Sequence, residues 1–198
     1  MQGQNFAAVA TEHELSEVVC ERLLRDFAPE LEVTHRLRRG GFGYLKNKLR
    51  NFLELSKIQT VFLLTDLDQS ACAPSLIRSW MGDRTIPGDF LFRVAEREIE
   101  AWLLGDENGI RKLLGKKSAK IPEKVDSIPD PKKLLLKLAA SAPRSLRQEL
   151  CGAPDAAAAQ GLGYNKILCD FVRSSWHVGR ARERSESMER TIRRLEAL

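Results

Sequence analysis

The chain has 198 residues, of which 43% are hydrophobic, so it can bury a core as one domain with or without an appendage, and this composition argues against intrinsic disorder. Its formal net charge of +5 permits a polyanionic partner without requiring one. It has no apolar run of membrane-spanning length and no C-x-x-C pair among its four cysteines, which predicts a cytoplasmic protein with free thiols and no membrane association.

Strands and helices alternate through the first hundred residues. Apolar or alternating segments predict strands at residues 5–10, 31–37, 61–64 and 89–95. Apolar residues at helical spacing predict helices at about residues 13–27 and 45–53, after Pro74, and from about residue 96. This order predicts an α/β fold, with a mainly parallel sheet flanked by helices and joined by right-handed crossovers.

The rest of the chain is helical in pattern. Asp130 and Pro131 supply an N-cap and a first-turn proline, and residues 154–163 are the best linker candidate. The last segment is basic, and its arginines either touch phosphate or form a solvated face; they are Arg180, Arg182, Arg184, Arg190, Arg193 and Arg194. We expect an α/β core of residues 1–105 and a helical extension of residues 106–198 packed on it.

Two carboxylates follow the apolar strand at residues 61–64. Asp66 and Asp68 project to the same side if strand geometry continues, while Leu67 turns back toward the core. Open parallel sheets bind ligands at the carboxyl ends of their strands, and carboxylate oxygens are ligands for Mg²⁺ or Mn²⁺. The alternative is a solvated Asp-x-Asp turn that ends a buried strand.

Glu12 stands at the carboxyl end of the first strand. If the first and third strands are neighbours, Glu12 lies close to Asp66 and Asp68. Carboxylates that cluster raise one another's pKa values, so such a cluster persists where a cation compensates the charge. Glu12, Asp66 and Asp68, which we call the acidic triad, are therefore the predicted ligands of a divalent metal ion.

A glutamate that ends the first strand, together with an apolar strand that ends in Asp-x-Asp, resembles the TOPRIM catalytic domain of topoisomerases, primases and overcoming-lysogenization-defect nucleases. Further segments are similar to a bacterial TOPRIM-like family of unknown function over nearly the whole chain; they are residues 12–17, 43–46, 64–69, 92–104 and 128–132. The stretch Arg-Glu-Ile-Glu-Ala-Trp-Leu-Leu at residues 97–104 is the most distinctive of them.

The resemblance implies a nuclease that uses Mg²⁺ or Mn²⁺ to cleave DNA or RNA, with Glu12 as general base or acid. Related groups are found as partners of ATPases in antiphage defence, which implies an ATPase partner for this chain. The third aspartate of the family pattern is absent after Asp68, and Glu98 and Glu100 are the candidates to supply further metal ligands. The alternative for these two glutamates is an exposed helical face paired with Arg97.

Four cations flank the glycine-rich loop at residues 40–43 and are expected to gather a nucleic-acid backbone near the acidic triad; they are Arg38, Arg39, Lys46 and Lys48. The alternative for each is ordinary surface charge.

Three other functions remain open. A haloacid-dehalogenase-like phosphatase would use Asp66 as its nucleophile, and a receiver-like protein would accept phosphate. A non-catalytic regulatory or binding subunit of an ATPase complex would retain the acids without using them. The sequence does not determine whether the substrate is DNA or RNA, or whether the protein is a monomer or a homo-oligomer.

Overall fold

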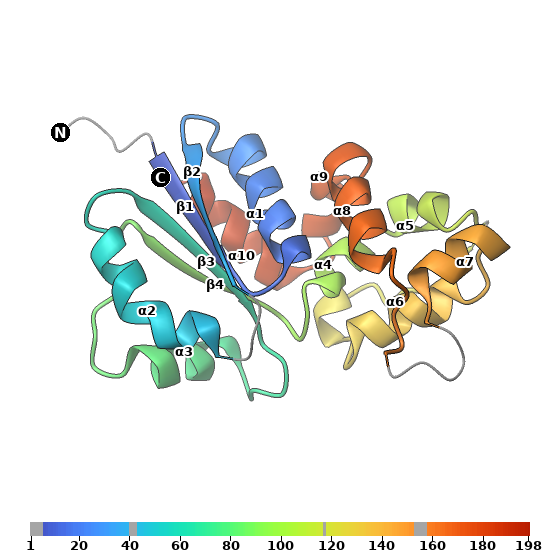
Figure 1. Cartoon of the computed structure of the whole chain (residues 1–198), viewed down its shortest axis with the longest axis horizontal. Coiled ribbons are helices and arrows are strands. Elements are labelled where there is room, and N and C mark those ends of the chain that lie inside the picture. Colours follow the sequence, from blue (N-terminus) through green and yellow to red (C-terminus); the bar gives the residue numbers. More distant parts are fainter. Residues whose placement is uncertain (1–5, 40–42, 117, 153–157) are drawn as a thin grey trace. The chain divides into compact units, whose positions relative to one another are not determined.

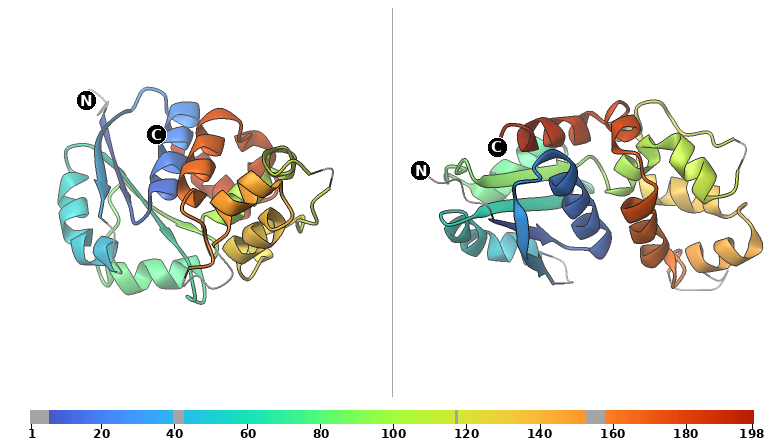
Figure 2. Two further views of the ribbon diagram at one scale, coloured as in Figure 1. Left: turned by 45° about the vertical axis from the view of Figure 1, so that its right-hand side comes forward. Right: turned by 90° about the horizontal axis from the view of Figure 1, so that it is seen from above.

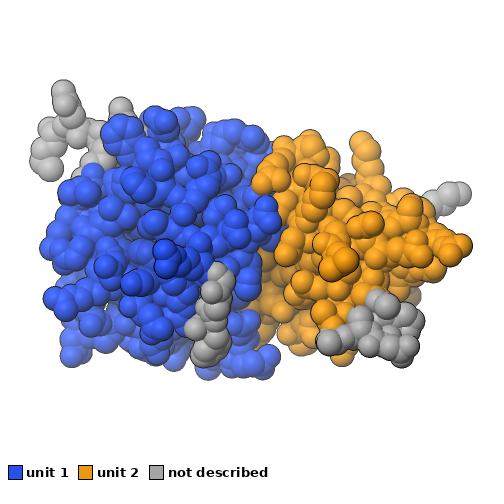
Figure 3. Space-filling model, viewed as in Figure 1, with its two compact units in different colours: residues 1–96, 190–198 blue, residues 97–189 orange. Residues whose placement is uncertain are grey.

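The computed structural model describes residues 6–39, 43–116, 118–152 and 158–198. The chain divides into unit 1, formed by Met1–Glu96 with Arg190–Leu198, and unit 2, formed by Arg97–Glu189 (Figure 3). The expected boundary between residues 105 and 106 falls inside unit 2, and the end of the chain belongs to unit 1. The order of the elements along the chain does not predict this assignment. Only the part of the last helix from Arg190 onward belongs to unit 1, and it includes the buried residues Ile192 and Leu195.

Unit 1 contains a four-stranded sheet whose neighbouring strands are all parallel, in the order β2-β1-β3-β4 (Figure 1). The strands are β1 (Phe6–Thr11), β2 (Glu32–Arg38), β3 (Thr60–Asp66) and β4 (Phe90–Ala95). Residues 7–10 of β1 and residues 61–64 of β3 are buried and continuously apolar, because helices cover both faces of a parallel sheet. The predicted α/β class with a parallel sheet is confirmed.

The helices of unit 1 are α1 (Glu14–Phe27), α2 (Tyr44–Leu55), α3 (Ala73–Met81) and the part of α10 (Glu186–Leu195) from Arg190 onward. The helices α2 and α3 pack their apolar sides on one face of the sheet, against Leu63 and Phe92 among others. Right-handed crossovers then require α1 to cover the other face. It does so with residues at helical spacing, including Leu15, Val19 and Leu23.

Unit 2 is helical in the residues that the structure describes. Its helices are α4 (Glu100–Gly105), α5 (Glu107–Leu113), α6 (Pro131–Ala139), α7 (Arg144–Leu150), α8 (Tyr164–Ser174) and α9 (Val178–Arg182), with a 3₁₀ turn at Val125–Ser127. Asp130 caps α6 by accepting a hydrogen bond from the Lys133 N–H at 2.8 Å, as its place before Pro131 predicts.

The expected linker lies within unit 2 and does not join the units. Its residues 154–157 fall outside the described part of the chain. Near its end, Gln160 forms an antiparallel bridge with Cys151, and the Gly161 N–H donates to the Leu150 carbonyl at 2.8 Å. Gln160 and Gly161 therefore lie beside the end of α7 and the residue that follows it.

Burial agrees with the apolar pattern in most places. Trp102 and Trp176 are buried. All four cysteines are free, and Cys20 and Cys169 are buried, whereas Cys72 is exposed. Within the described ranges no helix combines the length and apolar character that crossing a membrane requires.

Candidate functional site

The acidic triad lies where the order of the strands reverses. The chain passes from β1 through α1 to β2 on one side, then through α2 to β3 on the other side of β1, so the reversal falls between β1 and β3. Ligands of open α/β sheets bind beyond the carboxyl strand ends at such a reversal. Glu12 directly follows β1, and Asp66 ends β3. The two strands are paired neighbours, with Ala10 beside Leu63, so that part of the prediction is confirmed.

Asp66 and Asp68 stand on either side of a buried leucine. The Leu67 N–H donates to the Ala95 carbonyl at 2.9 Å, and the Leu67 side chain is fully buried in the core under α2 and α3. As predicted, Leu67 turns back toward the core. Asp66 is half-buried, with its Oδ1 atom inaccessible to solvent, whereas Asp68 is exposed.

A tight turn begins directly after Leu67. The Ser70 N–H donates to the Leu67 carbonyl at 3.0 Å, which places Asp68 at the first central position of the turn. Asp68 has φ +49°, in the left-handed region that aspartate and asparagine adopt more readily than most residues. The turn therefore fixes the backbone of one member of the acidic triad.

Electrostatic interaction links Glu12 to Asp68. Burial raises the pKa of Glu12, positive charge on His13 lowers it, and the negative charge of Asp68 raises it again. Two carboxylates from different strands are thus close enough to repel each other. A cation placed between them would relieve this repulsion.

The donor set fits a divalent metal ion that is only partly coordinated by protein. In the described residues no three or more His, Cys, Asp or Glu side chains are gathered closely enough to hold a metal ion. A closed cage is not what Mg²⁺ requires, because it is usually bound by one or two carboxylates together with waters and substrate phosphates. Two of the three carboxylates of Glu12, Asp66 and Asp68 would supply the hard oxygen ligands of such an open site.

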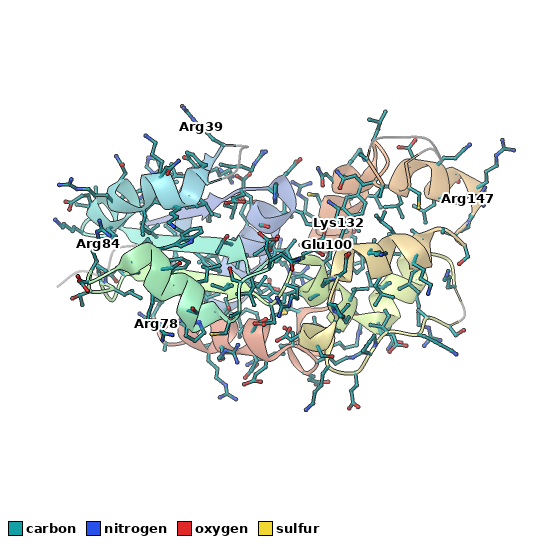
Figure 4. All side chains as sticks on the ribbon, turned by 90° about the horizontal axis from the view of Figure 1, so that it is seen from below. Arg39, Arg78, Arg84, Glu100, Lys132 and Arg147 are labelled. Carbon is teal, nitrogen blue, oxygen red and sulfur yellow. The ribbon has the colours of Figure 1, made fainter. Side chains whose placement is uncertain are left out.

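Glu98 and Glu100 have hydrogen-bond partners within unit 2. Glu100 is 6% exposed, and its Oε1 accepts a hydrogen bond from the Tyr164 hydroxyl at 2.8 Å. Glu98 accepts one from the Lys132 N–H at 2.9 Å, and burial raises its pKa. Glu100 and Lys132 are labelled in Figure 4. The alternative interpretation, that Glu100 lies on an exposed helical face, is therefore wrong. Metal binding by Glu98 or Glu100 stays a prediction.

The Tyr164→Phe variant tests the structural role of Glu100. Removing the hydroxyl leaves a buried carboxylate oxygen without its donor, which should lower the free energy of unfolding by about 1–3 kcal/mol. Urea denaturation measures the change. Tyr44→Phe is the matched control, because the Tyr44 hydroxyl makes no hydrogen bond with the described residues. Equal stability of both variants would show that the Tyr164 hydrogen bond is unimportant.

A basic pocket of about 350 Å³ lies where β2 ends and α2 begins. We call it the basic pocket; it is lined by Arg36, Leu37, Arg38, Arg39, Tyr44 and Lys48. Three of the four predicted nucleic-acid contacts line it, whereas Lys46 is exposed and is not among the lining residues. Arg38 pairs in register with Thr11, the residue before Glu12. The pocket therefore lies beside the strand end that carries the acidic triad's glutamate.

Two of the pocket's cations have carboxylate partners and two do not. Arg36 pairs with Glu21, and Arg38 Nε lies 3.2 Å from Glu17 Oε2. Arg39 and Lys48 form no ion pair with the residues that the structure describes. Arg36 and Tyr44 were absent from the predicted nucleic-acid contacts, although Arg36 shares a side of β2 with Arg38, which was a usable signal.

Three of the C-terminal arginines are paired with carboxylates and do not form a free solvated face. Within unit 2, Arg180 Nε lies 2.7 Å from Asp106 Oδ1, Arg182 Nε lies 2.5 Å from Glu189 Oε2, and Arg184 Nη1 lies 3.0 Å from Glu107 Oε2. Arg184 also donates to the carbonyls of residues 121, 122 and 123. These guanidinium groups therefore hold unit 2 together.

Comparison with known proteins gives a family but no characterised relative. The model of a family described as "Domain of unknown function (DUF4276)" matches residues 10–196. No curated protein and no solved structure matches the chain.

Proposed function

The chain belongs to the family defined by the DUF4276 domain, and we propose that it is a divalent-metal-dependent nuclease with a TOPRIM-like catalytic unit that cleaves DNA or RNA in the cytoplasm. The observation that carries this proposal is the origin of the acidic triad from two paired strand ends at the reversal of strand order. The resemblance of the chain to groups that act with ATPases in antiphage defence supplies the proposed setting.

Each side chain of the acidic triad has a role in this proposal. Asp66 and Asp68 hold Mg²⁺ or Mn²⁺ through carboxylate oxygens. When bound, the ion supplies charge neutralisation of a phosphodiester and orientation of the attacking water. Glu12, which comes from a different strand, serves as general base or acid and moves a proton to or from that water.

The basic pocket supplies the contact with substrate. Arg39 and Lys48 are the pocket cations without ion pairs among the described residues, so their charge is available to phosphate groups. Guanidinium and ammonium groups that neutralise backbone phosphates give affinity without base specificity. We therefore expect the substrate backbone to cross the ends of β2 and β1.

A metal-dependent cleavage assay tests the proposal. Purified protein is incubated with single- and double-stranded DNA and RNA in the presence of Mg²⁺, Mn²⁺ or a chelator. We expect cleavage of at least one substrate with a metal ion and none with the chelator. Folded protein that cleaves no substrate with either ion would overturn the nuclease assignment.

One observation favours a second candidate, a non-catalytic TOPRIM-like subunit of an ATPase complex. In the described part of the chain, no three side chains of metal-binding type are close enough to hold an ion. A protein that does not use its acidic residues for catalysis would not need them closer together. This subunit should bind neither metal ion in a calorimetric titration and should co-purify with an ATPase. A measurable metal affinity that depends on Asp66 would favour the nuclease instead.

Charge removal in the basic pocket should weaken binding of nucleic acid. The double variant Arg39→Gln with Lys48→Gln is expected to lower affinity about tenfold and to reduce the slope of log K against log salt concentration by about 2, because two phosphate contacts are lost. Fluorescence anisotropy at several salt concentrations measures both. The control is Arg78→Gln with Arg84→Gln, an equal change of charge at exposed residues in and just after α3 (Figure 4). Equal slopes for the two double variants would contradict the prediction.

A further inference from the structure

A cluster of three arginines lies on the face of unit 1 opposite to α2 and α3. Phe92 and Val94 of β4 face the core under those helices, so Arg93 between them points to the other side of the sheet. Arg190 and Arg194 are one turn apart on α10 and share a helix face. The Arg194 guanidinium donates to the Gly88 carbonyl just before β4, and α10 runs alongside β4 in Figure 2. We call these three residues the arginine cluster.

Arg93 and Arg194 have no carboxylate in ion-pair contact among the described residues. Arg93 is half-buried, and its Nε atom is shielded from solvent without a hydrogen-bond acceptor in the described part of the protein. Burial, and then the positive charges of Arg194 and Arg190, lower the pKa of Arg93. Neither Arg93 nor Arg194 forms an ion pair within the described residues.

Arg93 and Arg194 differ in this respect from three arginines of unit 2. Arg180, Arg182 and Arg184 each have a carboxylate partner within 3.0 Å. A half-buried guanidinium that is repelled by two others costs free energy, and a bound anion would recover that cost. Arg190 is exposed, so the cluster is accessible from solvent.

We propose that the arginine cluster is a binding site for a phosphate group, separate from the basic pocket. Guanidinium groups present N–H donors in planar forks, and this geometry matches the oxygens of a phosphate group. The phosphate belongs either to a free phosphate monoester, which carries two negative charges, or to a nucleic-acid backbone, in which each phosphodiester carries one, and guanidinium groups can donate to the oxygens of both. The site does not depend on the proposed nuclease activity.

Thermal unfolding in matched salts tests the site. Orthophosphate is compared with chloride at equal ionic strength and pH, without metal ions. At about 100-fold above the dissociation constant, phosphate should raise the melting midpoint by about 5 °C over chloride. Arg190→Gln with Arg194→Gln should lose this difference, whereas the control Arg78→Gln with Arg84→Gln should keep it. Both double variants remove two positive charges, so a general salt effect would not distinguish them.

An oligonucleotide arm separates the two sources of phosphate. A rise with orthophosphate that is lost in the double variant assigns the site to a free phosphate ester. A rise with a short DNA or RNA duplex alone, lost in the same variant, assigns it to backbone phosphates. A phosphate response that survives the double variant, or no response to any of these ligands, overturns the proposal.

Arg93→Met gives an independent check. This change keeps an apolar stem and removes the half-buried charge, so it should raise the melting midpoint in chloride and abolish the response to phosphate. A purely structural role of Arg93 predicts the opposite result in chloride, a lower melting midpoint. That outcome would show that the charge of Arg93 is already compensated within the protein. Because no cleavage is measured, failure of this test is distinct from failure of the nuclease proposal.

Discussion

Asp66→Asn should abolish metal-dependent cleavage of nucleic acid, with a loss of about 10³-fold in rate or more. Asparagine has nearly the same volume, so the half-buried position at the end of β3 remains filled while the negative charge is lost. A factor of 10³ corresponds to about 4 kcal/mol of transition-state stabilisation, within the several kcal/mol that a bound metal ion supplies. Initial cleavage rates at saturating Mg²⁺ measure the effect.

Two further variants make this result interpretable. Asp68→Asn should also abolish cleavage, and it keeps a residue that tolerates the left-handed backbone at this position. Asp83→Asn is the control, because Asp83 is an exposed acid of unit 1 outside the acidic triad, and its activity should equal that of the wild type. Unchanged circular dichroism shows that each variant is folded. Full activity in Asp66→Asn and Asp68→Asn together would reject the acidic triad as the catalytic site.

Asp106→Ala should destabilise unit 2 more than the loss of the Tyr164 hydroxyl does. The Asp106 side chain is fully buried and accepts hydrogen bonds from Arg180 Nε at 2.7 Å, the His177 N–H at 2.8 Å and the Gly109 N–H at 3.0 Å. Removing one partner of a buried ion pair typically costs about 3–5 kcal/mol. Because the Arg180 side chain is partly exposed, we expect about 3 kcal/mol, measured by urea denaturation.

The Asp106 carboxylate requires a glycine at position 109. A Cβ atom at Gly109 would lie 2.2 Å from Asp106 Oδ2, so only glycine allows the carboxylate to cap α5. Asp106→Asn should be destabilised less than Asp106→Ala, because the amide oxygen can still accept from one N–H group. Asp170→Ala, at an exposed acid on α8, should change stability little. Equal stability of the Asp106→Ala and Asp170→Ala variants would contradict a stabilising role of the buried carboxylate.

Much of unit 1 could be predicted from the sequence, because the spacing of apolar residues within each helix or strand indicates which of its faces is buried. The apolar run at residues 61–64 predicts β3 and the acids after it, and the spacing of Leu15, Val19 and Leu23 predicts α1. The pairing of β1 with β3, expected from the acids, is present. Among the described residues, no three side chains are placed closely enough to coordinate a metal ion. Strand pairing does not determine this, because the positions of side chains beyond a strand end depend on the turns that follow it.

By itself, the sequence determined the α/β class, the places of the strands and the strand ends that carry Glu12, Asp66 and Asp68, because local periodicity records which faces are buried. Only the tertiary structure decided which charges have partners. Glu100 meets Tyr164 across 64 residues, and Asp106 meets Arg180 across 74, whereas Arg93 receives two other arginines as neighbours. Charged residues look alike along a chain, and only folding decides whether an opposite charge, a like charge or water lies beside each one.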